Sequence, residues 1–163
     1  MKKILITIKL ISFFFALTVN AQEAAIKYKP TPETKKFEGT WIYSYGNEKL
    51  LIKLKNQENF FLKDVNAFAD VVQGSVLYIK NNKTIYQNEN AIISGRTGAI
   101  MPYELWAIFK DPGGRSGKLI LTFKDIKDTN TLTLKIIPRN HLDSSKYPPL
   151  KIPDSISLKR VVE

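Results

Sequence analysis

Few residues in this chain have the types and the spacing that catalysis or metal binding requires. The glycine-rich run from Gly113 to Lys118 resembles a phosphate-binding loop, whose backbone amides and lysine hold phosphate oxygens. However, Pro112 stands where the first required glycine should be, Leu119 replaces the Ser or Thr, and a strand pattern follows where a helix is needed. We therefore predict a glycine-rich hairpin loop at this position.

The candidates for acid, base or metal chemistry are equally sparse. His141, with Asp143 nearby, is the only histidine, so a catalytic site built on two histidines is excluded. No serine lies in a nucleophile elbow, and the absence of cysteine excludes thiol catalysis, cysteine metal sites and disulfides. The spacing of the remaining carboxylates does not favour a catalytic pair; these are Asp64, Asp70, Glu104 and Asp111. We predict a protein that is not an enzyme and has no metal or cofactor.

The N-terminus carries the three regions of an export signal. Lysines follow the first methionine, residues 4–19 are largely apolar, and residues 19–21 (Val-Asn-Ala) provide a small-residue cleavage site before Gln22. Lys9 interrupts the apolar stretch and leaves it short of the ~20 residues that a membrane-spanning helix needs. We expect residues 1–21 to be a signal peptide, and the mature protein to be periplasmic or secreted with no integral membrane segment.

The charge of the chain is strongly basic but not concentrated. The formal net charge is +10, and removal of residues 1–21 takes three lysines and no acid, which lowers it to +7. Nucleic-acid binding needs basic residues gathered with aromatics. Here many lysines instead alternate with apolar residues along predicted strands: Lys53, Lys55, Lys118, Lys124 and Lys135. We predict a solvated exterior and no nucleic-acid partner, with weak contact to an anionic envelope surface as the alternative.

In the mature chain, we predict a linker over residues 22–36 and a single β domain over residues 37–163. Turn signals separate short β-rich runs, a pattern typical of a sandwich or barrel. Gly46-Asn47 and Asn81-Asn82 are the turn pairs of two tight hairpins. The expected fold is all-β: an antiparallel, meander-type barrel or barrel-like sandwich of about 8 to 10 strands.

Three predicted strands are apolar on both faces: residues 60–65, 71–80 and 103–110. Two apolar faces fit a central strand covered on both sides, an oligomer interface, or the wall of an interior cavity. The sequence leaves these possibilities open, and it leaves the oligomeric state undetermined.

The two ends of the β domain carry complementary residues. Counting by twos places Gly39 and Trp41 on one face of the first strand, and Leu158 and Arg160 on one face of the last. A buried guanidinium is costly unless it is hydrogen-bonded, and a flat aromatic ring gives it a stacking partner. If the first and last strands are neighbours, as closure of a barrel demands, Arg160 lies across Trp41.

The residues at this closure carry a family resemblance. Residues 37–43, Phe-Glu-Gly-Thr-Trp-Ile-Tyr, resemble the opening strand of lipocalin-like and other calycin barrels, whose Gly-x-Trp is capped by an arginine or lysine from the last strand. The order of segments also resembles a family of small secreted bacterial proteins of unknown function, in which a signal ending Asn-Ala-Gln precedes a Gly-Thr-Trp strand and a Gly-Asn turn. The chain departs from fatty-acid-binding barrels, because Gly46-Asn47 leaves no room for their helical lid, and it lacks the later Thr-Asp-Tyr motif of lipocalins.

The resemblance implies a module that binds a small apolar or amphipathic ligand in the barrel or at its mouth. The expected lining residues are Trp106, Tyr103, Phe109 and Tyr78. Trp106 points away from its neighbours Leu105 and Ala107, and the sequence leaves open whether it faces the cavity or the outside. The alternative function is a structural or interaction protein of the cell envelope, with a solid core, that contacts a protein, a glycan or a membrane surface.

The cleavage site generates a first testable prediction. Because residues 19–21 precede Gln22, the exported protein should begin at Gln22, with or without cyclisation of that glutamine. Intact-mass measurement of the exported protein checks this. A mass that still includes residues 1–21, or recovery of the protein from the membrane fraction alone, would contradict it.

Overall fold

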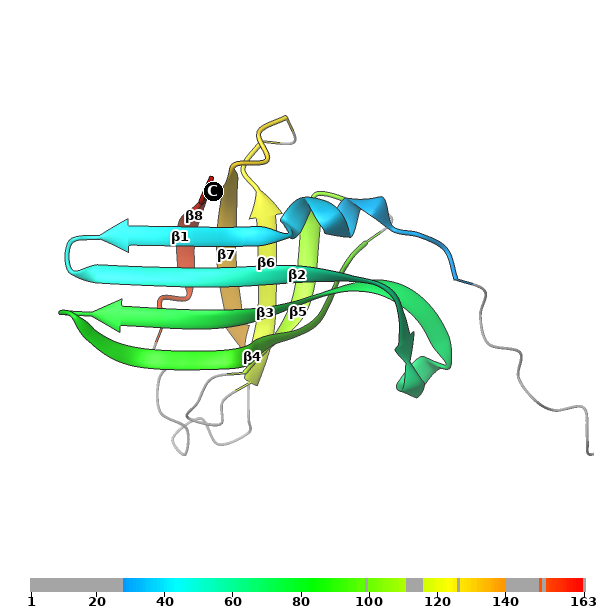
Figure 1. Cartoon of the computed structure of the whole chain (residues 1–163), viewed down its shortest axis with the longest axis horizontal. Coiled ribbons are helices and arrows are strands. Elements are labelled where there is room, and N and C mark those ends of the chain that lie inside the picture. The colour runs from blue at the N-terminus through cyan, green and yellow to red at the C-terminus, as the bar shows by residue number, and fades with distance from the viewer. Residues whose placement is uncertain are drawn as a thin grey trace, which may run out of the picture.

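The strands close into one antiparallel barrel in the computed structural model, which describes residues 28–98, 100–110, 116–125, 127–139, 150 and 152–162 (Figure 1). The strands are β1 (Gly39–Tyr45), β2 (Glu48–Leu62), β3 (Ala67–Lys80), β4 (Lys83–Thr97), β5 (Glu104–Lys110), β6 (Ser116–Phe123), β7 (Thr131–Pro138) and β8 (Ser155–Arg160). Each strand pairs with its neighbours in sequence, and β8 pairs with β1. The prediction of an all-β meander barrel is therefore confirmed. The predicted signal peptide lies outside the described residues.

Tight turns between the first strands follow from residues that accept a positive φ. Gly46, at φ +54°, joins β1 to β2, whose register begins at the pair Tyr45 and Glu48. Asn81 and Asn82, at φ +51° and +58°, join β3 to β4 in the same way. Positive φ at the centre of a two-residue turn matches the twist of the flanking strands. Both predicted hairpins are present.

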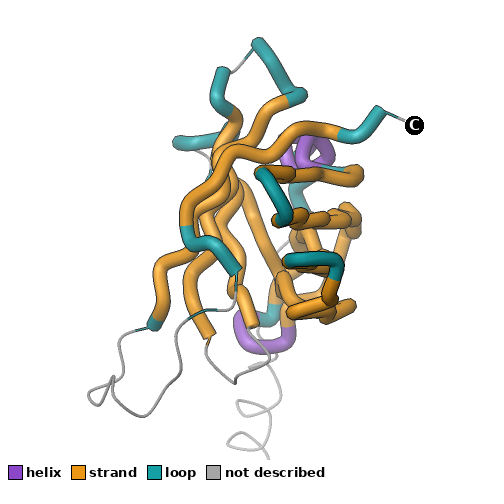
Figure 2. Tube along the Cα trace, turned by 90° about the vertical axis from the view of Figure 1, so that its left-hand side faces the viewer, coloured by secondary structure: helices purple, strands orange, loops and turns teal. Residues whose placement is uncertain are grey.

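The barrel is built as two walls that cross steeply. Figure 1 shows β1 to β4 side by side across the view, with β5 to β8 behind them running up the view, and Figure 2 shows the two walls after a quarter turn. Side chains alternate along each strand, and the inward set forms one apolar cluster. Leu50, Ile52 and Leu54 on β2 face Leu119 and Leu121 on β6 in this cluster, and all five are at most 1% exposed.

The segments expected to be apolar on both faces differ in how their two faces are buried. Within residues 60–65, only the first three belong to β2, and Lys63–Val65 forms a short 3-10 helix, η2. Phe61 and Val65 are exposed. On β5, the inward residues are buried while Trp106 and Ile108 lie on the outer surface at 47% and 53% exposure. On β5 the second apolar face is thus an outer surface of the barrel, whereas on β3 the adjacent residues Val71 and Val72 are both fully buried.

The segment before β1 contains a short helix. Residues 22–36 are predicted to be a surface linker, and the end of this segment belongs to a 3-10 helix, η1 (Pro32–Phe37), in which Thr34 and Phe37 are fully buried. The ring centroids of Phe37 and Phe123 lie 4.6 Å apart. The backbone carbonyl of Phe37 accepts a hydrogen bond of 2.9 Å from Nε1 of Trp41. The prolines that suggest a linker also suit the start of a helix, and the buried phenylalanine makes η1 part of the core.

The first and last strands meet at two residue pairs. Trp41 pairs with Arg160 and Ile42 with Lys159, and the Val161 amide donates a hydrogen bond of 2.8 Å to the Thr40 carbonyl. The guanidinium carbon of Arg160 lies 4.2 Å from the centroid of the fully buried Trp41 ring. The contact expected from the sequence between the two ends of the barrel is therefore present.

Arg160 also satisfies its donors with backbone carbonyls. Its two terminal nitrogens donate to the carbonyls of Glu38 and Lys36, at 2.5 and 2.6 Å, and Nε donates to the Thr129 carbonyl at 3.2 Å. Burial lowers the pKa of Arg160 below the usual arginine value, but a guanidinium stays protonated in proteins. One cation thus holds the end of η1, the β6–β7 turn and β1 together.

Glycine is required where Arg160 crosses β1. Gly39 has φ +126°, a conformation that side chains rarely adopt, and a Cβ atom there would lie 2.9 Å from a terminal nitrogen of Arg160. The Gly-x-Trp spacing therefore has a physical reason in this chain. Glycine makes room for the guanidinium, and the tryptophan two residues later, on the same face, stacks beneath it.

The closure generates a second prediction. Trp41→Ala should lower the free energy of unfolding by about 3 to 5 kcal/mol, as a large core truncation does, and Arg160→Ala should lower it by less. Because the two side chains touch, the double variant should deviate from additivity by about 1 kcal/mol. Urea denaturation of the four proteins measures this. Additive losses would show that the contact contributes nothing.

Candidate binding site on the outer wall

The interior of the barrel is filled by side chains. Phe109 is 0% exposed and Tyr78 3% exposed, and their neighbour Tyr86 stacks edge-on against Phe109 with ring centroids 6.2 Å apart. Side chains that lined a cavity large enough for a ligand would keep surface accessible to a water-sized sphere. Tyr78 and Phe109 keep almost none, so the structure places them in packed core and not around a cavity.

The other two predicted ligand residues, Trp106 and Tyr103, are more exposed. Trp106 is 47% exposed on the outer face of β5, since the inward positions on either side of it are Leu105 and Ala107. Tyr103, just before β5, is half-buried, and its carbonyl accepts a hydrogen bond of 3.2 Å from the Phe123 amide. Tyr103 packs against the core cluster that contains Tyr78 and Phe109, so the structure brings these three to the core and leaves Trp106 on the outer surface. A period of two fixes that Trp106 opposes its neighbours, and closure of the barrel puts it outside.

The exposed Trp106 is held in place by its neighbours. Its Nε1 donates a hydrogen bond to Oε1 of Glu104, and Nζ of Lys118 lies 3.7 Å from the centre of its ring. Its cross-strand partners are Arg96 on β4 and Ile120 on β6. A cation over the ring and a hydrogen bond at its nitrogen orient the indole. The ring is a positioned surface feature.

Trp106 belongs to an apolar area that crosses three strands. Ile108 on β5 pairs with Lys118 on β6, which pairs with Ile137 on β7, so these residues form one row on the outer face. Trp106, Ile108 and Ile137 are 47%, 53% and 43% exposed, and we call them the outer patch. A hollow of about 400 Å³ lies beside it, with Lys118 and Arg139 in its lining. Contiguous exposed apolar side chains with a polar rim are typical of interaction sites.

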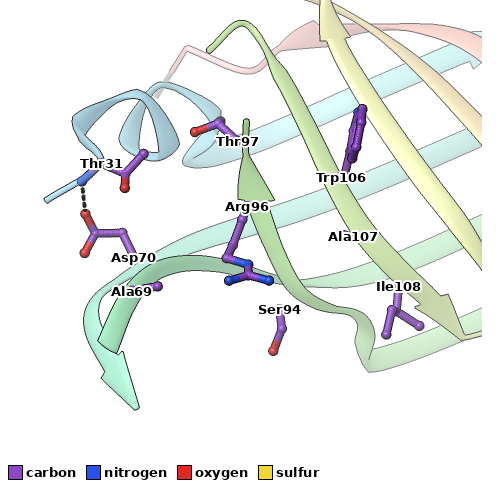
Figure 3. A pocket seen from close by; sticks show the side chains of 9 residues that line it. All are labelled: Thr31, Ala69, Asp70, Ser94, Arg96, Thr97, Trp106, Ala107 and Ile108. Carbon is purple, nitrogen blue, oxygen red and sulfur yellow. Dashed lines mark hydrogen bonds between the residues drawn. The ribbon is translucent and has the colours of Figure 1, made fainter. Parts of the chain in front are cut away.

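A second hollow adjoins the outer patch where β3 and β4 separate. The β3–β4 pairing ends at Val72 and Gly95, although β3 continues beside β2 to the pair Leu62 and Ala67. The resulting groove has a volume of about 580 Å³, and we call it the notch (Figure 3). Its lining residues are Thr31, Ala69, Asp70, Ser94, Arg96, Thr97, Trp106, Ala107 and Ile108. The notch thus opens beside the outer patch and shares Trp106 and Ile108 with it.

A β-bulge shapes one wall of the notch. Ser94 and Gly95 together face Ala107 alone, between the pairs Ile93–Ile108 and Arg96–Trp106. Ser94 has φ +47°, and a Cβ on Gly95 would lie 3.0 Å from the Ala107 Cβ. Bulges bend a strand and redirect side chains. The Ser-Gly pair inside an apolar run is the sequence signal that would have located this site.

Asp70 forms the opposite wall and ties down the N-terminal segment. This carboxylate is 4% exposed and accepts hydrogen bonds from the Tyr28 hydroxyl at 2.6 Å, the Thr31 amide at 2.6 Å and the Asn59 amide at 3.0 Å. Figure 3 shows the bond to Thr31 at the edge of the notch. The three donors come from the N-terminal segment and from β2, so Asp70 connects parts of the chain that are distant in sequence.

These hydrogen bonds set the acidity of both partners. Burial alone would raise the pKa of Asp70, but the donors Tyr28, Thr31 and Asn59 outweigh it and lower the pKa below the usual value of 3.8. The hydrogen bond between the Tyr28 hydroxyl and Asp70, together with burial and the charge of Asp70, raises the pKa of Tyr28 from 10.0 to about 12. Asp70 is therefore charged at neutral pH and fully engaged as an acceptor.

The structure describes three of the four carboxylates considered from the sequence, and each has a different environment. Asp64 lies in η2, Glu104 bonds Trp106, and Asp70 is engaged as above. Asp111, His141 and Asp143 lie outside the described residues. Within the described part of the chain, no three acidic, histidine or cysteine side chains are grouped to hold a metal ion. The same residues contain no helix with the length and apolarity to cross a membrane.

The fold and the packed core define a small closed meander barrel with its hollows on the outer wall. The chain belongs to the DUF6705 family, described as a family of unknown function, whose model matches residues 1–146. No curated protein and no solved structure matches the chain.

The engagement of Asp70 generates a third prediction. Asp70→Asn should lower the free energy of unfolding at pH 7 by about 1 to 3 kcal/mol, because the amide replaces an acceptor with a donor that faces other donors. A depressed pKa stabilises the fold above the usual value of 3.8, and that contribution is lost as the pH falls through the folded pKa. The gap between wild type and variant should therefore narrow in acid.

Two controls separate this effect from a general change of charge. Asp64→Asn makes the same change on an exposed carboxylate in η2 and should leave stability at pH 7 nearly unchanged. In Asp70→Asn, the phenolate absorbance of Tyr28 should appear closer to pH 10 than to pH 12. Equal losses in both variants, with no shift in the tyrosine titration, would contradict the assignment.

Proposed function

We propose that the protein is an exported, non-enzymatic interaction module that binds its partner on the outer wall, at the outer patch and the notch. The observation that carries the proposal is a contrast in exposure. Phe109, Leu105 and Leu119 are 0% exposed in the interior, whereas Trp106 and Ile108 are about half exposed on the outside. Of the two functions that the sequence suggests, this contrast favours the interaction protein with a solid core over a carrier of an interior ligand.

The size of the barrel supports the same conclusion. A barrel of about eight strands has an interior that its own side chains can fill, or that holds one small ligand if they are small. Here η1 adds Phe37 to the interior beside Trp41 and Phe123, so one end is also filled by aromatic rings. An apolar ligand would have to displace packed side chains, which costs their packing energy.

The outer patch supports the proposal by its composition. Tryptophan and arginine are the residues most enriched among those that dominate binding energy at interfaces. Trp106 and Arg96 are cross-strand partners here, and Ile108 and Ile137 extend the apolar surface around them. Export is proposed from the N-terminal sequence, which would place this surface in the periplasm or outside the cell.

A crosslinking experiment tests where the partner binds. A photo-crosslinking residue at Ile108, expressed in the cell that encodes the protein, should give one adduct of discrete mass. The same residue at Lys49, which is exposed on β2 in the other wall, should give none. Ile137→Glu should abolish the adduct at position 108 while changing the free energy of unfolding by less than about 0.5 kcal/mol, because the site is exposed.

Thermal shift supplies the complementary measurement. Fatty acids and other apolar ligands should not raise the Tm, because the interior is filled by side chains. A ligand that did bind inside the barrel would raise the Tm by mass action. A rise that is equal in wild type and Ile137→Glu, together with no adduct at position 108, would replace the proposal with interior ligand binding.

A further inference from the structure

The notch has features that the outer patch lacks. Among the described residues, β3 from Ala67 to Val71 is paired with β2 alone, and Arg96 and Thr97 of β4 are paired with β5 alone. Two strand edges therefore face each other across a groove of about 580 Å³. Strand edges without a partner present backbone donors and acceptors to any extended chain that enters.

A polar side chain in the notch also lacks a partner. Oγ1 of Thr97 is buried and makes no hydrogen bond within the described part of the chain. Figure 3 shows this side chain on the wall of the notch that faces Thr31. A buried hydroxyl without a partner costs free energy, so such a group in a native structure needs an explanation.

The charges of the notch select the sign of the ligand. Among the described residues, the charged ones in its lining are Arg96 and Asp70. Asp70 carries a negative charge, but the three hydrogen bonds that it accepts all come from its own chain. Arg96 is exposed, and no ion pair or hydrogen bond to it is found among the described residues. The donors of Arg96 are therefore open to a ligand, and a guanidinium binds a carboxylate with two parallel hydrogen bonds.

Trp106 argues for a peptide over a sugar. A sugar ring would stack on the open face of the indole, yet Nζ of Lys118 already covers one face at 3.7 Å. The rest of the half-exposed ring, with Ile108 beside it, can contact side chains of an extended peptide. Extended peptides commonly bind by adding a strand to an open sheet edge, where backbone bonds give affinity and side-chain pockets give specificity.

We infer that the notch binds an extended acidic segment of a partner protein, which lies between the separated ends of β3 and β4 and places a carboxylate on Arg96. The inference rests on the proposed function, because it names the chemistry of the partner at one end of the same wall. The peptide backbone would pair with the strand edges of β3 and β4 that have no partner strand.

Two synthetic peptide pools test the inference. Both consist of heptapeptides with alternating valine and threonine, and they differ in a fixed central residue, glutamate or lysine. Titrated into purified protein labelled with ¹⁵N, the glutamate pool should shift the backbone amide signals of Ala69, Arg96 and Thr97 to saturation. The lysine pool should bind at least about tenfold more weakly, the expected effect of losing one charge-assisted contact.

Variants and modified probes separate the parts of the inference. Arg96→Glu should reverse the preference between the pools, and Arg96→Lys should keep the preference with reduced affinity. N-methylation of the peptide backbone should weaken the glutamate pool, because it removes the donors that strand pairing uses. An acidic oligosaccharide, hexameric oligogalacturonate, should leave the three amide signals unchanged.

Each contrary result has a distinct meaning. Equal binding of the two pools, or preferential binding of the oligosaccharide, would overturn the inference even if the adduct at Ile108 forms, in which case the proposed function stands. Glutamate-pool binding that N-methylation leaves unchanged would overturn strand addition. Loss of both the adduct and the peptide binding would overturn the proposed function as well.

Discussion

The half-buried guanidinium of Arg160 is the constraint on which the closure of this barrel depends. A charge in that position must be hydrogen-bonded and stacked, and the carbonyls of Lys36, Glu38 and Thr129 and the ring of Trp41 meet that need together. These partners come from η1, the β6–β7 turn and β1. Satisfying one cation therefore fixes the register of the last strand against the first, and it orders the segment that precedes the barrel.

That ordering decides where the hollows of the molecule lie. With η1 fixed, Phe37 fills one end of the barrel against Phe123, and the interior is occupied by the chain itself. The β4 bulge then separates β4 from β3, while Asp70 holds Thr31 across the opening. The hollows and the exposed aromatic ring lie outside as a consequence. In a barrel with a filled interior the accessible hollows lie on the outer wall, whereas a hollow barrel of the same topology has its cavity inside.

Much of this fold follows from local rules that a single sequence displays. Alternation placed Leu50, Ile52 and Leu54 on one face, and the Gly-Asn and Asn-Asn pairs located two hairpins. The contact between Arg160 and Trp41 could also be predicted from the sequence, because an arginine among aliphatic positions has few low-cost partners. The outer patch and the notch could not be predicted in this way. The Asp70–Tyr28 bond spans 42 residues, and η1 belongs to a segment whose prolines and charges suggested a surface linker.

Trp106 shows most clearly what the sequence determined and what it left to the tertiary structure. A period of two fixes which residues share a face with Trp106, because that relation depends only on the local geometry of a strand. Which face turns inward depends on how all the strands close, and both faces of β5 are apolar, so the pattern carries no preference. By itself the sequence determined the strands, the turns and the pair that joins the ends. Only the closed barrel decided inside from outside, because that distinction is a property of the whole sheet.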